Sequence, residues 1–378
     1  MTYKYSIKSL QALAGSVVIL ALSACASGSS SPKPDELGPN PALLGARLAW
    51  SGKIGPVDFP LQVKASGGNV SLAGSDGSVV SLDARTGAEL WRANVGAPIV
   101  AGVGSDGRFA AVVTRDSELV VMDQGQSPWR TRLTTQVFTA PLVAGERVFV
   151  FGADRSVAAF DAATGRKLWQ NQRPGEALVL RQSGLLMAVG NTLVVGLSGH
   201  LVGMNPINGS VVWDAPVATP RGTNDIERLV DLVSGASREG DVVCVRAFQA
   251  AVACVDTVRG VVNWKKPAFG SVGLQGDTQQ VYGVESDGRL IAWRRADGEP
   301  VWTSDRLRYR QLSAPLVLGR SVVVGDDTGW VHLLSRSDGS ALARLATDGS
   351  ALGATPVVVN GTMVVVSSKG GVFGFQPE

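Results

Sequence analysis

A short pattern recurs eight times along this 378-residue chain, at intervals of about 40 residues. Each copy is a turn followed by a run of alternating apolar residues, and many copies end in Asp. The copies read SDGSVVSLD (75–83), RDSELVVMD (115–123), DRSVAAFD (154–161), SGHLVGMN (198–205), FQAAVACVD (248–256), SDGRLIAWR (286–294), DTGWVHLLS (327–335) and SKGGVFGFQ (368–376). A unit of this length buries its apolar faces only against neighbouring copies, so the pattern predicts a repeat architecture.

Each repeat has the strand content of one blade of a β-propeller. Apolar residues alternate with a period of two, which is typical of strands rather than helices. Earlier strands of the unit begin near Ala-Pro or Thr-Pro, as at 97–98 and 355–356, and continue in β-branched runs such as 147–151. We therefore expect four short antiparallel strands in each unit. A β-sandwich is the alternative all-β architecture, but it does not predict eight equal repeats.

Most copies are followed by a turn glycine and then a tryptophan, as in DARTGAELW, DAATGRKLW and NPINGSVVW. The glycine is expected in a tight turn with positive φ. The tryptophan is expected to cover the seam between two blades, because each sheet of a propeller buries both faces. The predicted structural docking residues are Trp91, Trp129, Trp169, Trp213, Trp264 and Trp302, while the seventh copy has Ala343 instead.

Trp50 stands alone near the start of the body, with no copy of the pattern before it, and the eighth copy has no tryptophan after it. The strand that carries Trp50 therefore supplies what the last blade lacks. The sequence predicts an all-β, eight-bladed propeller over 45–378, closed by pairing of its N- and C-terminal strands. Such closure removes the open sheet edge of a linear array.

The N-terminus has the layout of a secretory signal, predicted over 1–24. Lys4 and Lys8 precede an apolar run at 10–22 that is shorter than the roughly 20 residues of a membrane span. The run ends Leu-Ser-Ala-Cys, which resembles the bacterial lipobox and implies that Cys25 is lipidated. An ordinary signal with a cysteine near its cleavage site is the alternative.

After the lipobox-like cysteine, residues 25–44 are predicted to be a lipidated cysteine and a flexible tether, rich in Ser, Pro and Gly. In lipoproteins an Asp after the cysteine favours the inner membrane, so the resemblance and Ala26 together imply the periplasmic face of the outer membrane. Without Lys4 and Lys8 the 35 basic residues fall to 33, against 32 acidic ones. This near-balance argues against binding to nucleic acid.

The other cysteines are Cys244 and Cys254, which flank a predicted hairpin turn near 248–250. A three-residue turn pairs the two thiols across the strands, whereas a two-residue turn sends them to opposite faces, and the sequence leaves both open. No metal site is predicted, since the two histidines, His200 and His332, are lone strand residues expected to be exposed or paired locally.

The repeat Asp-x-x-Thr-Gly-x-x-x-Trp resembles the tryptophan-docking repeat of quinoprotein dehydrogenases. That resemblance implies a periplasmic alcohol or sugar dehydrogenase with pyrroloquinoline quinone and calcium. The enzymes of that family carry two adjacent cysteines over the cofactor, and no two cysteines are adjacent here. We therefore expect neither cofactor nor catalysis.

The whole chain is more similar to the BamB family, the propeller lipoproteins of the outer-membrane β-barrel assembly machinery. Two stretches make the resemblance specific: ALVLR at 177–181 and IERLVD at 226–231. In that family both stretches lie in the surface that binds the periplasmic POTRA repeats of BamA. The resemblance implies a non-catalytic scaffold that assists insertion of outer-membrane proteins, with Leu178, Leu180, Arg181 and Asp231 at the family's functional positions. A generic periplasmic docking propeller is the alternative.

Three further residues near these stretches have different expected roles. Arg228 either contacts the partner or pairs with Asp231. Val233 stands where the family often has a second Asp, so a second acidic contact is in doubt. Arg155 belongs to a turn of the repeat outside both stretches and is expected to play no part in binding.

The lengths of the connections between units support the same surface independently of the resemblance. From the docking tryptophan to the next inner strand, the connections after Trp169 and Trp213 are the longest. With four strands per blade, such connections all emerge on one face of the ring. Long loops on a rigid scaffold often carry binding residues, although surface loops also tolerate insertions at little cost.

Replacing the cysteine of the lipobox-like sequence tests the predicted anchor. Cys25→Ser is expected to leave the protein unprocessed or free of the membrane, because no other segment of the sequence is long and apolar enough to hold it there. Fractionation of cells that lack the partner proteins measures this. A mutant that still sediments with the outer membrane would show that the lipobox assignment is wrong.

Overall fold

The computed structural model describes residues 32–173, 179–219 and 229–378. The chain divides into two compact units, 1–34 and 35–378. Of the first unit only 32–34 are described, and they have no regular secondary structure. Within the described residues of the second unit every regular element is a β-strand, and no helix suited to crossing a bilayer occurs among them. The expected all-β class is confirmed.

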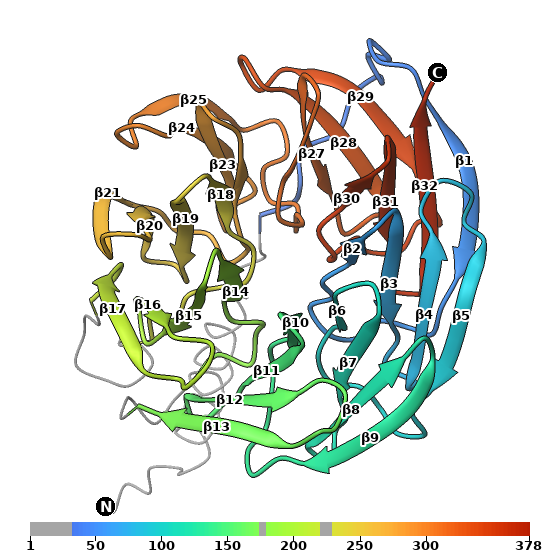
Figure 1. Cartoon of the computed structure of the whole chain (residues 1–378). Coiled ribbons are helices and arrows are strands. Elements are labelled where there is room, and N and C mark those ends of the chain that lie inside the picture. Colours follow the sequence, from blue (N-terminus) through green and yellow to red (C-terminus); the bar gives the residue numbers. More distant parts are fainter. Residues whose placement is uncertain (1–31, 174–178, 220–228) are drawn as a thin grey trace, which may run out of the picture. The chain divides into compact units, whose positions relative to one another are not determined.

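The strands form eight sheets of four antiparallel strands each, arranged as the blades of a ring (Figure 1). We number the blades along the chain and give each blade's strands from the innermost to the outermost. Blades 1 to 4 are β2–β5 (Lys64–Ser66, Asn69–Ala73, Ser78–Asp83, Glu89–Asn94), β6–β9 (Gly104–Ser105, Phe109–Val113, Glu118–Asp123, Gln126–Arg132), β10–β13 (Leu142–Ala144, Arg147–Phe151, Ser156–Asp161, Lys167–Gln172) and β14–β17 (Leu186–Val189, Thr192–Leu197, His200–Met204, Val211–Pro216). Blades 5 to 7 are β18–β21 (Ser237–Glu239, Val242–Ala247, Ala251–Asp256, Val261–Pro267), β22–β25 (Gln275–Gly276, Gln280–Val284, Leu290–Arg294, Pro300–Ser304) and β26–β29 (Leu316–Leu318, Ser321–Gly325, Trp330–Ser335, Ala341–Ala346).

Blade 8 joins the two ends of the propeller. Its first three strands are β30–β32 (Val357–Val359, Thr362–Val366, Gly371–Pro377), and its outermost strand is β1 (Ala46–Lys53). The register between β1 and β32 runs from Ala46 opposite Pro377 to Lys53 opposite Gly371. Figure 1 shows the blue and red ends of the chain side by side in this sheet. The predicted closure by N- and C-terminal strands is confirmed.

The core lies in the seams between blades, because the middle strands of each sheet bury both faces. Each of the eight seams holds its own cluster of buried apolar side chains. In the seam between blades 4 and 5, for example, Val194 and Leu201 pack against Val243 and Val255. A blade therefore has no core of its own, as the repeat pattern predicts.

Each docking tryptophan crosses its seam to the turn between the third and fourth strands of the following blade. The indole N–H groups of Trp50, Trp129, Trp169, Trp264 and Trp302 donate to turn carbonyls of the next blade at 2.7–3.0 Å. The turn glycine packs against the indole ring of the tryptophan. At Gly209, whose φ is +74°, an added Cβ would lie 2.4 Å from Trp169, so only glycine fits there.

Ala343 occupies the register position of a docking tryptophan in blade 7. The following blade is blade 8, whose third and fourth strands, β32 and β1, come from opposite ends of the chain. No chain turn joins these two strands, so a tryptophan at 343 would have no turn to dock on. The physical reason for the alanine is the ring closure itself.

A segment before β1 lies on blade 7 in this region. The side chain of Asn40 accepts from the Arg344 N–H and donates to the Arg344 carbonyl, and the Leu43 N–H donates to the Leu342 carbonyl at 2.7 Å. The Arg344 guanidinium donates to the carbonyls of Leu37 and Gly38. Residues 37–43, which fall in the range predicted as tether, thus cover the free edge of β29.

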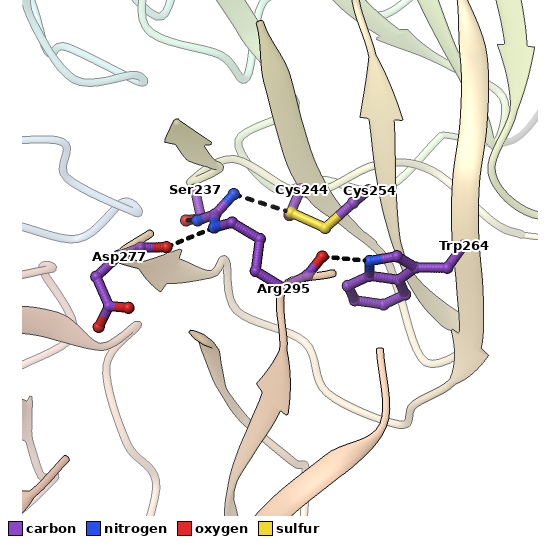
Figure 2. Close-up of a disulfide and its surroundings, with 6 residues drawn as sticks. All are labelled: Ser237, Cys244, Cys254, Trp264, Asp277 and Arg295. Carbon is purple, nitrogen blue, oxygen red and sulfur yellow. Dashed lines mark hydrogen bonds between the residues drawn. A yellow bond between two sulfur atoms is a disulfide. The ribbon is translucent and has the colours of Figure 1, made fainter. Parts of the chain in front are cut away.

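Cys244 and Cys254 form a disulfide between β19 and β20. The turn at 248–250 has three residues and sets the two cysteines opposite each other, which decides between the two registers that the sequence left open. Both side chains are fully buried. Figure 2 shows Arg295 of blade 6 next to this bond. One nitrogen of the Arg295 guanidinium lies 3.3 Å from Sγ of Cys244. The backbone carbonyl of Arg295 accepts from the indole N–H of Trp264.

A buried carboxylate organises the turn between β27 and β28. Asp326 accepts from the backbone N–H groups of Thr328 and Trp330 at 2.9 Å, while its second oxygen lies 2.9 Å from Nε2 of His332 and 3.3 Å from the Arg310 guanidinium. Burial alone would raise the pKa of Asp326, but these hydrogen bonds and the contact with His332 together lower it to about 2. The charged form is therefore the one that the fold stabilises.

Truncating a docking tryptophan should destabilise the ring. Trp169→Ala and Trp50→Ala are each expected to lower the free energy of unfolding by about 3 kcal/mol, because a large buried ring and a seam hydrogen bond are lost. Urea unfolding measures the change. Val212→Ala, at an exposed position on β17, is the control and should change stability by less than about 0.5 kcal/mol. Equal effects of the docking and control variants would contradict the seam assignment.

The lowered pKa of Asp326 predicts a specific dependence of stability on pH. The carboxylate contributes fully above its unfolded pKa of about 3.9, and this contribution is lost as pH falls towards its folded pKa of about 2. The free-energy gap between wild type and Asp326→Asn should therefore shrink by about 2 kcal/mol between pH 5 and pH 2. Urea unfolding across this range measures it, with the exposed Asp327→Asn as control. A gap independent of pH would contradict the prediction.

Candidate functional site

Two long connections and one turn meet on one face of the ring, at blades 3 to 5. The connections run from β13 to β14 and from β17 to β18, and the structure describes them except for residues 174–178 and 220–228. The turn at 152–155 joins β11 and β12. Because strands alternate in direction within each antiparallel blade, these connections and this turn emerge on the same face. We call residues 179–184 the binding loop.

The binding loop is fixed to its neighbours by backbone hydrogen bonds. The Ser234 N–H donates to the Ser183 carbonyl at 2.8 Å, and Gly184 forms a β-bridge with Val233. The Gly184 N–H donates to the Thr139 hydroxyl at 2.9 Å. The two long connections therefore form one structural unit.

Side chains around the interior of the ring add further contacts to this unit. The amide nitrogen of Gln62, in the lead into blade 1, donates to the Ser183 hydroxyl at 3.3 Å and also to the hydroxyl of Ser234. Gln182 donates to the Ser271 carbonyl in the connection between blades 5 and 6. Gln62 thus ties blade 1 to the connections that lead into blades 4 and 5.

Asp231 links the two connections to the turn of blade 3. Its Oδ2 accepts from the Leu180 N–H at 3.0 Å, and its Oδ1 lies 3.8 Å from a guanidinium nitrogen of Arg155. The side chains of Asp231 and Arg155 are only 19% and 6% exposed. The turn that carries Arg155, which the sequence sets outside both stretches, folds directly against Asp231 although it lies 76 residues earlier in the chain.

Leu180 and Arg181 are the more accessible members of the site. Leu180 is half-buried and lines a cavity of about 40 Å³ together with Phe138, Phe151, Leu232, Arg155 and Asp231. Arg181 is exposed, and its guanidinium carbon lies 5.6 Å from the centre of the Phe138 ring. The arrangement places an apolar side chain and a cation next to each other on a fixed loop.

The remaining residues of the predicted site have different outcomes. Leu178, Arg228 and the predicted lipidation residue Cys25 lie outside the described residues. Val233 is 1% exposed, so the position where the family often has an acidic residue is used for packing. Arg155 was not found from the sequence, and the available signal was its place in a turn where other copies of the repeat have glycine.

Both histidines are paired locally, as expected. Nδ1 of His200 lies 2.6 Å from Asp214, and Nε2 of the buried His332 lies 2.9 Å from Asp326. Within 32–173, 179–219 and 229–378, no three His, Cys, Asp or Glu side chains gather as a metal site would require.

A family match and two sequence relatives of this chain carry the same description. Residues 75–304 match the family described as "Outer membrane protein assembly factor BamB". The protein of that name from Burkholderia pseudomallei is 34% identical over 371 residues, which cover 97% of each chain. The one from Bordetella pertussis is 35% identical and covers 94% of this chain and 95% of its own.

Solved structures show the same fold at lower identity. BamB from Moraxella catarrhalis superposes with a TM-score of 0.80 at 24% identity, over 88% of this chain and 99% of that one. A quinohemoprotein alcohol dehydrogenase from Comamonas testosteroni superposes with a TM-score of 0.67 at 15% identity, over 90% of this chain and 79% of that one. These likenesses establish the propeller fold alone.

The sequence matches, in contrast, extend over nearly the full length of the relatives and exceed 30% identity. The family match at 75–304 includes the central repeats and the two long connections. Together with the eight four-stranded blades and the closure through β1, they show that the chain belongs to the BamB family of outer membrane protein assembly factors.

Proposed function

We propose that this protein is a non-catalytic scaffold lipoprotein of the outer-membrane β-barrel assembly machinery, and that it docks on the periplasmic POTRA domains of BamA. Membership of the BamB family supports the first part. The observation that carries the second part is the exposed Arg181 beside the half-buried Leu180 on a loop held by Asp231. Through this contact the scaffold assists insertion of outer-membrane proteins by the machinery.

The chemistry of the surface suits a protein partner. Leu180 at the rim of the small cavity offers an apolar anchor. Arg181 can donate two parallel hydrogen bonds to a carboxylate or to backbone carbonyls of the partner. An apolar centre with adjacent polar groups is the usual layout of an interface hot spot. Leu178 belongs to this proposal on family resemblance. Arg228 belongs to it as a residue that either contacts the partner or pairs with Asp231.

The proposal includes a lipid anchor in the outer membrane. Residues 1–24 act as the signal peptide, and Cys25 becomes the lipidated N-terminus. The remaining tether is short, because residues 37–43 already bind blade 7. The propeller would thus be held close to the periplasmic surface of the membrane and to the other subunits.

The groups that a dehydrogenase would need have other roles in this chain. The two described cysteines are bonded to each other inside blade 5. The carboxylates nearest the histidines are engaged with them in blades 4 and 7. Membership of the BamB family supports a function in protein binding rather than in cofactor chemistry.

Alanine substitutions in the binding loop test the docking surface. Leu180→Ala and Arg181→Ala are each expected to weaken binding to purified POTRA domains of the cognate BamA by about tenfold or more, as truncations at a hot spot do. The melting temperature should stay nearly unchanged, because Arg181 is exposed and Leu180 is only half-buried. Surface plasmon resonance and thermal melts measure the two quantities.

Arg259→Ala is the matched control, since it removes a 68% exposed arginine from a third-to-fourth-strand turn on the opposite face of blade 5. It should bind as wild type does. If the Leu180 and Arg181 variants also bind as wild type does, the docking surface lies elsewhere on the propeller.

A further inference from the structure

Arg155 occupies a backbone position that disfavours its own side chain. Its φ is +62°, in the left-handed region. In blades 1, 6, 7 and 8 the corresponding turn position is a glycine: Gly77, Gly288, Gly329 and Gly370, all with positive φ. The turns correspond because each makes the same hydrogen bond, such as Arg155 N–H to the Gly152 carbonyl and Gly288 N–H to the Glu285 carbonyl.

Four other blades have glycine at this turn position. A strained, buried arginine here therefore indicates that its side chain has a function. The guanidinium is withdrawn from water, with the side chain only 6% exposed, and burial of a charge is unfavourable unless it is paired. The Arg155 guanidinium forms an ion pair with Asp231, which lies in the connection between blades 4 and 5. The strain and the burial therefore both bear on the contact with Asp231, which is one of the interactions that the Arg155 side chain makes.

The contact continues from Asp231 to the binding loop. The carboxylate that faces Arg155 with one oxygen accepts the Leu180 N–H with the other at 3.0 Å. The neighbouring residue Arg181 is exposed to solvent. Orientation of the Asp231 carboxylate thus fixes the loop backbone at the residue directly before the exposed guanidinium.

We propose that Arg155 is a positioning residue for partner binding: it orients Asp231, which holds the Leu180 N–H and so presents Leu180 and Arg181 in the binding conformation. The inference rests on the proposed docking surface and deepens it. It assigns Asp231 a role inside the protein, in place of the direct contact with the partner that family resemblance implies. Arg155 acts through Asp231 and does not itself touch the partner.

Replacement by glycine separates the positioning role from a role in stability. Arg155→Gly removes the side chain and relieves the left-handed strain, so the melting temperature should stay close to that of wild type. Hydrogen exchange of the Leu180 amide in the free protein should accelerate by about tenfold, because local opening becomes easier. The affinity for the POTRA domains should fall by about tenfold, since a preorganised loop is lost.

Ser117→Gly is the matched control, because Ser117 has φ +58° at the same turn position in blade 2. It should change neither Leu180 exchange nor binding. The double variant Arg155→Gly, Asp231→Ala should be no worse in either measurement than Asp231→Ala alone, since both residues act through one contact.

Unchanged Leu180 exchange in Arg155→Gly, or effects of Arg155→Gly and Asp231→Ala that simply add, would overturn the positioning role. Arg181→Ala distinguishes failure of the positioning role of Arg155 from failure of the docking surface. If Arg181→Ala loses binding while Arg155→Gly keeps it, only the positioning role fails. If Arg181→Ala also binds as wild type does, the docking surface itself is wrong, and Leu180 exchange alone then decides the role of Arg155.

Discussion

The fold depends on one interaction repeated around the ring: an indole of one blade packed on the turn glycine of the next. Each blade is too thin to hold a core, so stability arises only where two blades meet. The indole covers the outer end of its seam, and in five of these tryptophans, Trp169 and Trp264 among them, the indole N–H donates to a turn carbonyl of the next blade. Blade 7 is the exception that explains the pattern, because ring closure leaves no turn to dock on and residues 37–43 cover its edge instead.

The closed ring gives its loops a fixed frame, and the candidate site uses three parts of that frame. The binding loop, the connection to blade 5 and a turn of blade 3 share hydrogen bonds, so none of them is positioned alone. Gln62 extends these restraints across the interior of the ring. A surface built in this way keeps its shape before it meets a partner, which lowers the entropy lost on binding.

The sequence could predict the features that recur in the repeats, and it could not predict a contact that occurs at only one place in the fold. Eight copies of the pattern, six of them followed by a tryptophan, determine the blades, the seams and the role of Trp50 in closure. The contact between Arg155 and Asp231 joins two turns that differ in sequence and lie 76 residues apart, and no period brings them together. Composition likewise made 25–44 resemble a tether, because composition does not reveal the hydrogen bonds that join 37–43 to Arg344 and Leu342.

The buried disulfide sets an order of events during folding. Cys244 and Cys254 are only 10 residues apart and meet as soon as their hairpin forms, whereas Arg295 and Trp293 arrive with the next blade. Once blade 6 has closed the seam, neither sulfur is accessible to an oxidant or a reducing thiol. Oxidation therefore has to precede the association of blades 5 and 6. A chain in which blades 5 and 6 associate before oxidation would retain two thiols beneath the Arg295 guanidinium. That seam would have to reopen before the disulfide could form.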